Sequence, residues 1–335
     1  MTIQHVIAQY STPAKVTRVE SLGGHGGFSG ATLWRLTTDS GELCLRRWPQ
    51  QHPSREHLLW IHGVLRSVRN LGLRIVPNYY QTSAGQTIVT NDGQLWELSD
   101  WLPGKAANSL DVTQQQLEAG MQALAQFHLA TAKTNQQPTT GRSPAITWRW
   151  ERFQQLTGDG IDRLAAASAG NATLPSDTVN ELITGFRELA PRAEETLARA
   201  ATLDTPLQPC LRDIWYEHVL FAPENEGHRV TGLVDFGAMR IESVAIDVAR
   251  LLGSYTGGDQ ARWSPGQSAY EAIRPLSEAE RQLAVAVDLA NGLMAGLQWI
   301  EWIYVDGRQF ADIPGVTRRL EATRDRLAAL AGEFA

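Results

Sequence analysis

The sequence predicts an α+β protein with two lobes, a small antiparallel sheet with one helix followed by a larger, mainly helical lobe. In the first hundred residues, segments that alternate apolar and polar residues are separated by glycine-containing turns. Beyond residue 101 the pattern changes to long segments with helical periodicity. One strand–turn–strand pattern, over residues 216–237, is embedded among those helices. We therefore expect an N-terminal lobe over residues 1–101 and a helical C-terminal lobe over residues 102–335.

The small lobe is expected to contain strands in the segments KVTRVESLGG, ATLWRLTTD and ELCLRRW, because each alternates and is bounded by turn residues. A helix is expected from about Ser54 to Asn70. Ser54 suits its N-cap and Gly72 its end. Further strands are expected in RIVPNYYQT, QTIVTND and QLWELSDW.

Composition limits the classes of partner. The 335-residue chain has a net charge of −6 and a pI near 5.8, which gives no electrostatic support for nucleic-acid binding. Cys44 and Cys210 lie in apolar, strand-like segments and form no disulfide pattern, which suits a reducing cytoplasm. The longest apolar segment, Leu283–Val305, contains polar and acidic residues, so we expect a buried helix rather than a membrane span. We expect a cytoplasmic protein without membrane or nucleic-acid partners; the sequence leaves its oligomeric state open.

A glycine-rich segment, SLGGHGGFSGATLW, follows the first predicted strand. It leads into another strand, whereas the dinucleotide-binding fingerprint leads into a helix. A glycine loop within a β-hairpin is the lid that covers ATP phosphates in kinases. The alternative is an ordinary turn. On the first interpretation the residues that contact the nucleotide are Gly24, Gly26, Gly27 and Ser29.

The strand LCLRRW carries a cation, Arg46, immediately after three apolar residues. A cation at this place is suited to nucleotide phosphates, and Glu56 on the following helix is its expected ion-pair partner, as in kinases. The alternative is a solvated charge on a strand.

The segment CLRDIWYEHVLF places ionisable residues inside an otherwise apolar stretch. Asp213 precedes the embedded hairpin, and Asp235 in VDFG stands at its end, so the hairpin is expected to bring the two carboxylates together. Phosphoryl transfer uses such a pair, with one carboxylate orienting the attacking hydroxyl and the other holding a metal ion. His218, five residues after Asp213, stands where a second metal ligand is expected.

These motifs, in this order, resemble the aminoglycoside phosphotransferase/choline kinase-type family, which is related to the protein kinases. The resemblance runs from about Val19 to Leu330. The family motif HxDxxxxN followed by D-[FW]-[GE] corresponds to LRDIWYEH and VDFG, and Asp247 in AIDVARLLG matches the start of a family helix. The segment WELSDWLPG resembles the hinge between lobes, which implies adenine contacts through the backbone of Asp100 and Leu102.

The resemblance implies a bilobal protein-kinase-like fold and ATP-dependent transfer of the γ-phosphoryl group to a hydroxyl of a small molecule. An amino-sugar, an amino-alcohol, a sugar and an amino acid are all compatible acceptors. ATP and Mg²⁺ are the implied cofactors, with Mn²⁺ as the alternative ion. Asp213 would be the catalytic base or orienter, His218 and Asp235 the metal ligands, and Arg46 the phosphate clamp.

The chain departs from the family pattern at three places. Arg46 replaces the usual Lys, Leu211 replaces the His of the catalytic motif, and His218 replaces the metal-binding Asn. Arg and Lys differ in shape and hydrogen bonding, and imidazole is a poorer ligand than an oxygen for Mg²⁺. The alternative function is therefore a nucleotide-binding protein with weak or no catalysis that acts as a regulator.

Overall fold

The computed structural model describes residues 3–12, 15–23, 30–50, 53–107, 112–134, 139–223, 227–310 and 312–333. It has two compact units. Unit 1 comprises Met1–Gln136 and Asp213–Arg240, and unit 2 comprises Gln137–Arg212 and Ile241–Ala335. The lobe boundary expected at Trp101 rests on a change of secondary structure, so this division by contacts does not test it.

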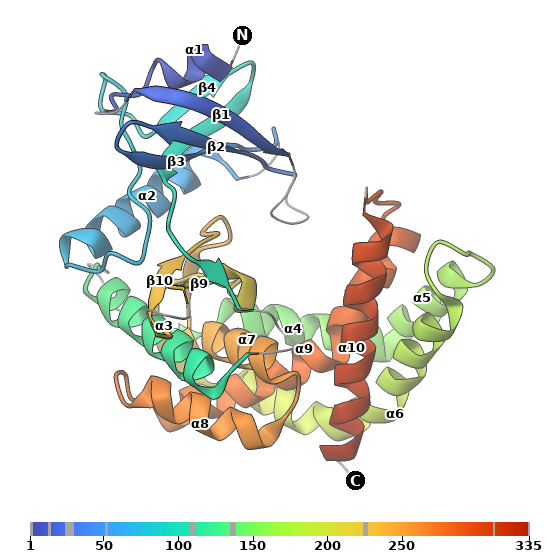
Figure 1. Ribbon diagram of the computed structural model, residues 1–335. Helices are drawn as coiled ribbons and strands as arrows, with labels where there is room; N and C mark the ends of the chain where they lie inside the picture. The colour runs from blue at the N-terminus through green and yellow to red at the C-terminus, as the bar shows by residue number, and fades with distance from the viewer. Residues whose placement is uncertain are drawn as a thin grey trace. The chain divides into compact units, whose positions relative to one another are not determined.

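Unit 1 contains a five-stranded antiparallel sheet with the order β1-β2-β3-β5-β4 (Figure 1). The hairpin between the last two strands turns through Asp92 and Gly93. Both have a positive φ, of 50° and 73°, as a two-residue turn that matches strand twist requires. The sequence therefore closes this hairpin locally. The strands are β1 (Val16–Gly23), β2 (Thr32–Thr38), β3 (Gly41–Arg47), β4 (Ile88–Asn91) and β5 (Gln94–Asp100).

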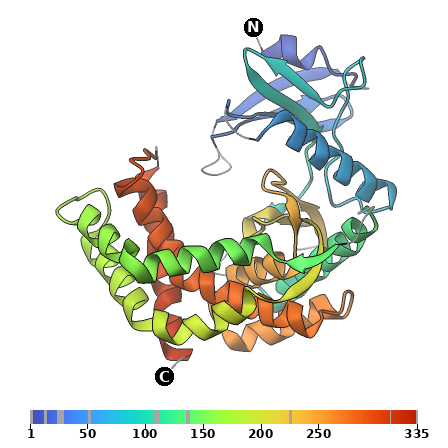
Figure 2. The same cartoon turned by 180° about the vertical axis from the view of Figure 1, so that it is seen from behind.

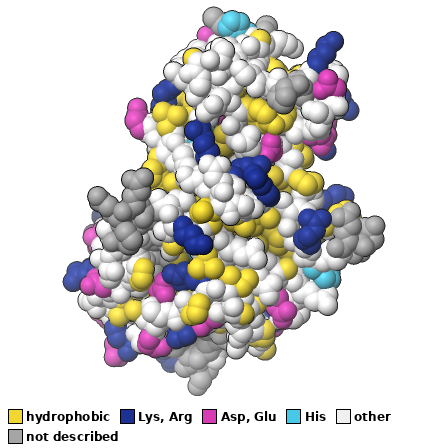
Figure 3. Space-filling model, turned by 90° about the vertical axis from the view of Figure 1, so that its left-hand side faces the viewer, with side chains coloured by type: hydrophobic (Ala, Val, Ile, Leu, Met, Phe, Trp, Pro, Cys, Tyr) yellow, Lys and Arg dark blue, Asp and Glu magenta, His cyan; other side chains and the backbone are white. Residues whose placement is uncertain are grey.

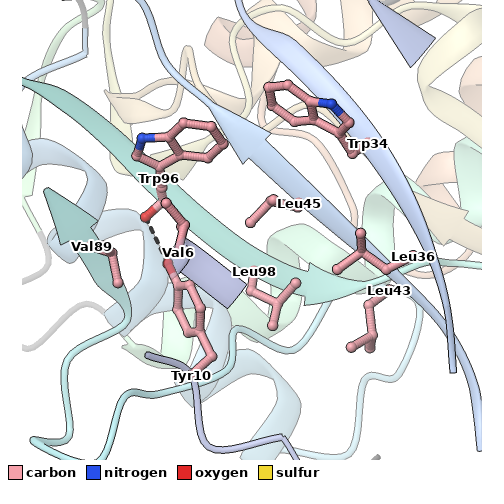
Figure 4. Close-up of a cluster of buried hydrophobic side chains, with 9 residues drawn as sticks. All are labelled: Val6, Tyr10, Trp34, Leu36, Leu43, Leu45, Val89, Trp96 and Leu98. Carbon is pink, nitrogen blue, oxygen red and sulfur yellow. Dashed lines mark hydrogen bonds between the residues drawn. The ribbon is translucent and has the colours of Figure 1, made fainter. Parts of the chain in front are cut away.

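One face of this sheet carries a buried apolar cluster (Figure 4). Helix α1 (Ile3–Ile7) and the residues after it cover the cluster, and the Tyr10 hydroxyl donates to the Trp96 carbonyl oxygen at 2.8 Å. The Trp34 and Trp96 rings stack with centroids 5.2 Å apart. Each such side chain contributes on the order of 1.5–3 kcal/mol on burial, so the cluster fixes the sheet. Its members are Val6, Tyr10, Trp34, Leu36, Leu43, Leu45, Val89, Trp96 and Leu98.

Helix α2 (Arg55–Asn70) belongs to the same unit and begins where the sequence predicted. The Ser54 hydroxyl caps it by accepting from the His57 amide at 3.2 Å. Its buried apolar residues recur at helical spacing along one face: Leu58, Ile61, Leu65 and Val68.

The rest of unit 1 is helix α3 (Gln114–Thr134) and a small sheet with the order β10-β9-β6, where a 3-10 turn, Tyr216–His218, precedes β9. Gly104 stands before β6 with φ of 107°. A Cβ there would lie 2.4 Å from the Phe221 carbonyl oxygen, so only glycine fits. The predicted hairpin is confirmed and is joined to the chain segment after β5. Its strands are β6 (Lys105–Ala106), β9 (Val219–Phe221) and β10 (Val230–Leu233).

Unit 2 is mainly helical, with a sheet of order β11-β8-β7 (Figures 1 and 2). Helix α9 lies at its centre and contacts α4, α5, α6, α7 and α10. The elements are β7 (Thr139–Arg142), α4 (Pro144–Gln155), the π-helical turn Leu156–Gly160, α5 (Ile161–Ser168), α6 (Ser176–Ala200), β8 (Asp204–Cys210), β11 (Arg240–Glu242), α7 (Val244–Thr256), α8 (Gln260–Glu271), α9 (Glu278–Tyr304) and α10 (Ile313–Glu333).

Among the described residues, α9 alone is long and apolar enough to cross a membrane. Its most apolar 18-residue window is 72% buried. Gly292 and Gly296 lie so close to Leu330 and Leu182 that an added Cβ would approach them within 2.4 and 2.6 Å. The helix is therefore the core of unit 2, as the sequence predicted.

Candidate active site

The predicted phosphate clamp, Arg46 on β3, lies between two carboxylates. Its Nη1 is 3.4 Å from Asp235 Oδ1, and its Nε is 3.7 Å from Glu97 Oε1. The guanidinium carbon lies 4.8 Å from the centre of the Trp48 ring, a cation–π contact. Burial opposes the charge of Arg46, but the two carboxylates outweigh it and raise its pKa above the ordinary value. Arg46 is therefore a permanent, positioned cation.

The prediction that Glu56 is the ion-pair partner of Arg46 is wrong. Glu56 is an exposed residue in the first turn of α2, where a carboxylate is favoured by the helix dipole and interacts with Ser54. The partner is Glu97, which stands directly opposite Arg46 in the register of β3 and β5. This pairing depends on which strands are neighbours, and no local pattern in the sequence shows it.

Glu97 also connects the sheet to α2. Its Oε2 is 3.0 Å from His62 Nε2, and His62 Nδ1 is 2.7 Å from the Thr87 hydroxyl. The Tyr79 ring stacks on the imidazole, with centroids 3.7 Å apart. Burial opposes ionisation of Glu97, but His62 and Arg46 hold its pKa below the usual range. The sequence analysis assigned no role to Glu97 or His62. The contact between their side chains joins α2 to β5, the strand that carries Glu97.

The segment from Asp213 to His218 places the His218 ring next to the backbone of Asp213. His218 Nδ1 lies 2.8 Å from the Asp213 carbonyl oxygen, and the Trp215 indole N–H donates to His218 Nε2 at 2.8 Å. Since Nε2 accepts, the proton is on Nδ1, which donates to the carbonyl. The segment from Asp213 to His218 is thus closed on itself by its own side chains.

Asp235 stands after β10 with a positive φ of 63°, an uncommon backbone for a non-glycine residue. Its Oδ2 lies 3.7 Å from His218 Nε2, and the Val234 amide donates to the His218 carbonyl oxygen at 3.0 Å. A Cβ on Gly237 would lie 2.7 Å from the Trp48 ring. The hairpin therefore places Asp235 beside His218, and Arg46 of β3 lies next to Asp235 within unit 1. That the hairpin also brings together the carboxylates of Asp213 and Asp235 stays a prediction.

A divalent cation fits Asp235 better than His218 in this arrangement. The Asp235 side chain is 31% exposed and supplies the hard oxygen that Mg²⁺ prefers. Two adjacent ligands of an octahedral Mg²⁺, each at about 2.1 Å, lie about 3 Å apart. Ligation by His218 would need its contact with Asp235 to shorten and the hydrogen bond from Trp215 to break. Ligation by Asp235 and by His218 both stay predictions.

The two predicted hinge residues, Asp100 and Leu102, already have partners within the protein. The Asp100 amide donates to the Asn78 carbonyl oxygen at 3.0 Å, and the Asp100 carbonyl accepts from the Ser99 hydroxyl at 3.3 Å. A Cβ on Gly232 would lie 2.9 Å from Leu102, so the Leu102 side chain packs against β10. Adenine contacts through Asp100 and Leu102 stay predictions, and those of Asp100 would compete with bonds already present. The predicted glycine-loop contacts, Gly24, Gly26, Gly27 and Ser29, lie outside the described residues.

In unit 2, the fully buried Asp247 holds the backbone that leads to Asp213. Its two carboxylate oxygens accept from the amides of Leu211 and Arg212 at 2.7 and 2.6 Å. Arg212 has a positive φ of 66°, a strained conformation that these bonds stabilise. The loop is therefore anchored by a carboxylate although Leu211 replaces the family's His.

Comparisons with known proteins agree with this fold. The sequence profile of the phosphotransferase enzyme family matches residues 23–284. An aminoglycoside phosphotransferase from Alicyclobacillus acidocaldarius superposes with a TM-score of 0.68 at 17% identity, covering 99% of this chain and 95% of that one. Spectinomycin phosphotransferase in complex with ADP and spectinomycin gives 0.65 at 11%, covering 98% and 97%. Amicoumacin kinase in complex with AMP-PNP and Ca²⁺ gives 0.56 at 12%, covering 97% and 96%. No curated protein matches the sequence.

The fold is therefore the α+β, protein-kinase-like fold of these enzymes, as the sequence predicted. Because the profile covers well over half of the chain, the protein belongs to the phosphotransferase enzyme family, whose members are small-molecule kinases.

Proposed function

We propose that the protein transfers the γ-phosphoryl group of ATP to a hydroxyl of a small molecule. The arrangement of Arg46 and Asp235 supports this best, since it joins a strand-borne cation to the carboxylate at the end of the hairpin. The contact of 3.4 Å is longer than the 2.7–2.9 Å typical of a charge-assisted hydrogen bond. Arg46 therefore keeps donors for nucleotide phosphates.

In the proposed reaction the acceptor oxygen bonds to the γ-phosphorus while the bond from that phosphorus to the β–γ bridging oxygen breaks, and ADP leaves. Asp213, exposed at the start of the catalytic segment, orients the hydroxyl and accepts its proton. Arg46 binds phosphate oxygens. A divalent ion, held by Asp235, would neutralise phosphate charge when bound.

The test is release of ADP, measured with a panel of hydroxylated metabolites of each charge class. Asp213→Asn should keep ATP affinity within a few-fold and lose turnover by about 10²–10⁴, the usual contribution of a positioned acid–base group. Asp235→Ala should weaken binding of metal–ATP in isothermal titration. Asp159→Asn, an exposed substitution of the same type in unit 2, is the control. Full turnover in Asp213→Asn would remove that residue from the mechanism.

The second candidate is a nucleotide-binding protein without catalysis. The hydrogen bonds on both ring nitrogens of His218 favour it, because they leave the histidine without a free lone pair for a metal ion. On this account ATP would bind, but no acceptor would stimulate ADP release.

A further inference from the structure

Unit 1 contains a pocket that the proposed chemistry does not use. Its volume is about 290 Å³, close to the lower end of about 300 Å³ that is usual for small-molecule sites. Its walls come from the turn between β2 and β3 with the start of β3, from the end of α2 and the chain after it, and from the end of β5 with the residues after it, all within unit 1. We call it the turn pocket. It is lined by, among others, Ser40, Glu42, Arg69, Arg74, Asp100 and Leu102.

The turn pocket is separate from the proposed phosphate clamp. Leu43 also lines it and lies three positions before Arg46 on β3, so the two side chains point to opposite faces of the sheet. None of the residues assigned above to the metal ion or to the acceptor hydroxyl is among its described lining residues. Asp100 and Leu102, whose backbone is predicted to contact adenine, do line it. A ligand in this pocket would therefore lie against the predicted hinge without occupying the phosphate clamp.

The two carboxylates of the turn pocket already have partners. Glu42 forms an ion pair with Arg35, its neighbour across β2 and β3. Asp100 Oδ2 accepts from the Asn78 amide at 3.0 Å, and Asp100 Oδ1 accepts from the Tyr80 hydroxyl at 3.1 Å. Both negative charges are therefore compensated within the protein, and they offer little attraction to a cationic ligand.

The two guanidinium groups that line the turn pocket keep unused donors. Arg69 Nη1 donates to the Val76 carbonyl oxygen at 2.5 Å and lies 3.6 Å from Asp100 Oδ2. The other N–H groups of Arg69, and all those of the exposed Arg74, have no partner in the described part of the chain. Arg69 is compensated by Asp100, so the surplus positive charge of the pocket is that of Arg74.

We propose that the turn pocket binds a small oxyanion, carboxylate or phosphate, with Arg74 and Arg69 as its donors. Guanidinium groups match the geometry of such oxyanions with paired hydrogen bonds. The Ser40 hydroxyl, which lines the pocket from the turn, supplies a further donor. Acidic and basic side chains are interspersed on the face seen in Figure 3, so the inference rests on this pocket and not on a general basic surface. It goes beyond the proposed function and does not depend on it.

The test measures binding in the absence of nucleotide, so no turnover is needed. The unfolding temperature is followed at constant ionic strength with glycerol 3-phosphate and with glycerate, which share the glycerol skeleton and differ in their oxyanion. Glycerol is the neutral control and ethanolamine the cationic one. Probes are used up to about 10 mM, ten times the upper end of usual KM values. An oxyanion that binds the folded protein should raise the unfolding temperature. A shift by glycerol 3-phosphate alone identifies a phosphate site, and a shift by glycerate alone identifies a carboxylate site.

Substitutions at exposed positions of the pocket locate the bound anion. Arg74→Gln should weaken oxyanion binding about 10–100-fold, the usual effect of losing hydrogen bonds to a charged group. Arg74→Lys keeps the charge but not the fork, so it should bind with intermediate affinity. Ser40→Glu places a carboxylate at the pocket and should abolish the shift, whereas the neutral Ser40→Gln should keep most of it. Arg66→Gln is the matched control, since Arg66 is an exposed arginine of α2 that does not line the pocket.

A shift that is caused by an oxyanion probe and is lost in both Arg74→Gln and Ser40→Glu supports the inference, whether or not any acceptor stimulates ADP release. Equal shifts from glycerol or ethanolamine overturn it, as does the absence of a shift from either oxyanion probe. An oxyanion shift that persists in either of the two variants, or is lost equally in Arg66→Gln, also overturns it, because the anion would then be bound elsewhere.

Discussion

Replacing Glu97 by Gln tests the observation that Arg46 is positioned from β5 and not from α2. The substitution keeps the shape of the side chain and removes its charge. Glu97 and His62 are 3% and 2% exposed, so water cannot replace the carboxylate as the partner of His62. Of the two carboxylates that the described residues offer it, Arg46 would keep Asp235, and His62 would lose the carboxylate that now lies 3.0 Å away.

Removing one member of a buried ion pair costs about 3–5 kcal/mol. Because Arg46 keeps a second carboxylate at 3.4 Å, we expect a loss near the lower end, about 3 kcal/mol. With a urea dependence of about 3 kcal/mol per M, this lowers the unfolding midpoint by about 1 M. Nucleotide affinity should fall about tenfold, since the clamp loses one of its two anchors.

The measurements are urea unfolding followed by tryptophan fluorescence and isothermal titration with ATP and Mg²⁺. Glu56→Gln is the matched control, because Glu56 is the partner that the sequence suggested and the structure places at the surface. It should unfold and bind ATP nearly as the wild type does. A Glu97→Gln protein as stable as the wild type, or equal effects of the two substitutions, would refute the assignment of Glu97 as the partner of Arg46.

Three further predictions concern the same elements. Folding lowers the pKa of Glu97, so its ionised form stabilises the protein above the ordinary carboxyl pKa of about 4.3, and this stabilisation is lost as pH falls through the lower folded-state pKa. The difference in unfolding free energy between wild type and Glu97→Gln should therefore shrink below about pH 4, and an unchanged difference there would contradict this prediction. Trp215→Phe removes the indole N–H that donates to His218 Nε2. If His218 is a metal ligand, metal–nucleotide affinity should rise and the metal-ion preference should move toward Mn²⁺. This effect must be absent when His218 is also replaced by Asn. Asp247→Asn keeps one acceptor oxygen for two amides, which should cost about 1.5–3 kcal/mol in urea unfolding and lower turnover; wild-type values for both would show that the carboxylate does not anchor the loop.

Local patterns in the sequence determined the elements and their order. Ser54 caps α2 because its hydroxyl reaches an amide three residues away, and Asp92-Gly93 closes a hairpin because both residues adopt a positive φ. The embedded hairpin likewise brings Asp235 to His218 over a short stretch of chain. Alternation and the Ser54 cap predicted the strands and α2, and the other two relations also involve residues that are close in sequence.

Only the tertiary structure decided the partners of the charged groups. Arg46 meets Glu97 because β3 and β5 are neighbours in a sheet whose order is not the order of the sequence, and Glu56 is excluded because it stands in the exposed first turn of α2. Strand order and helix packing are set by the burial of apolar residues summed over the whole chain. They decide which charged side chains become neighbours, and the sequence around each charged residue does not.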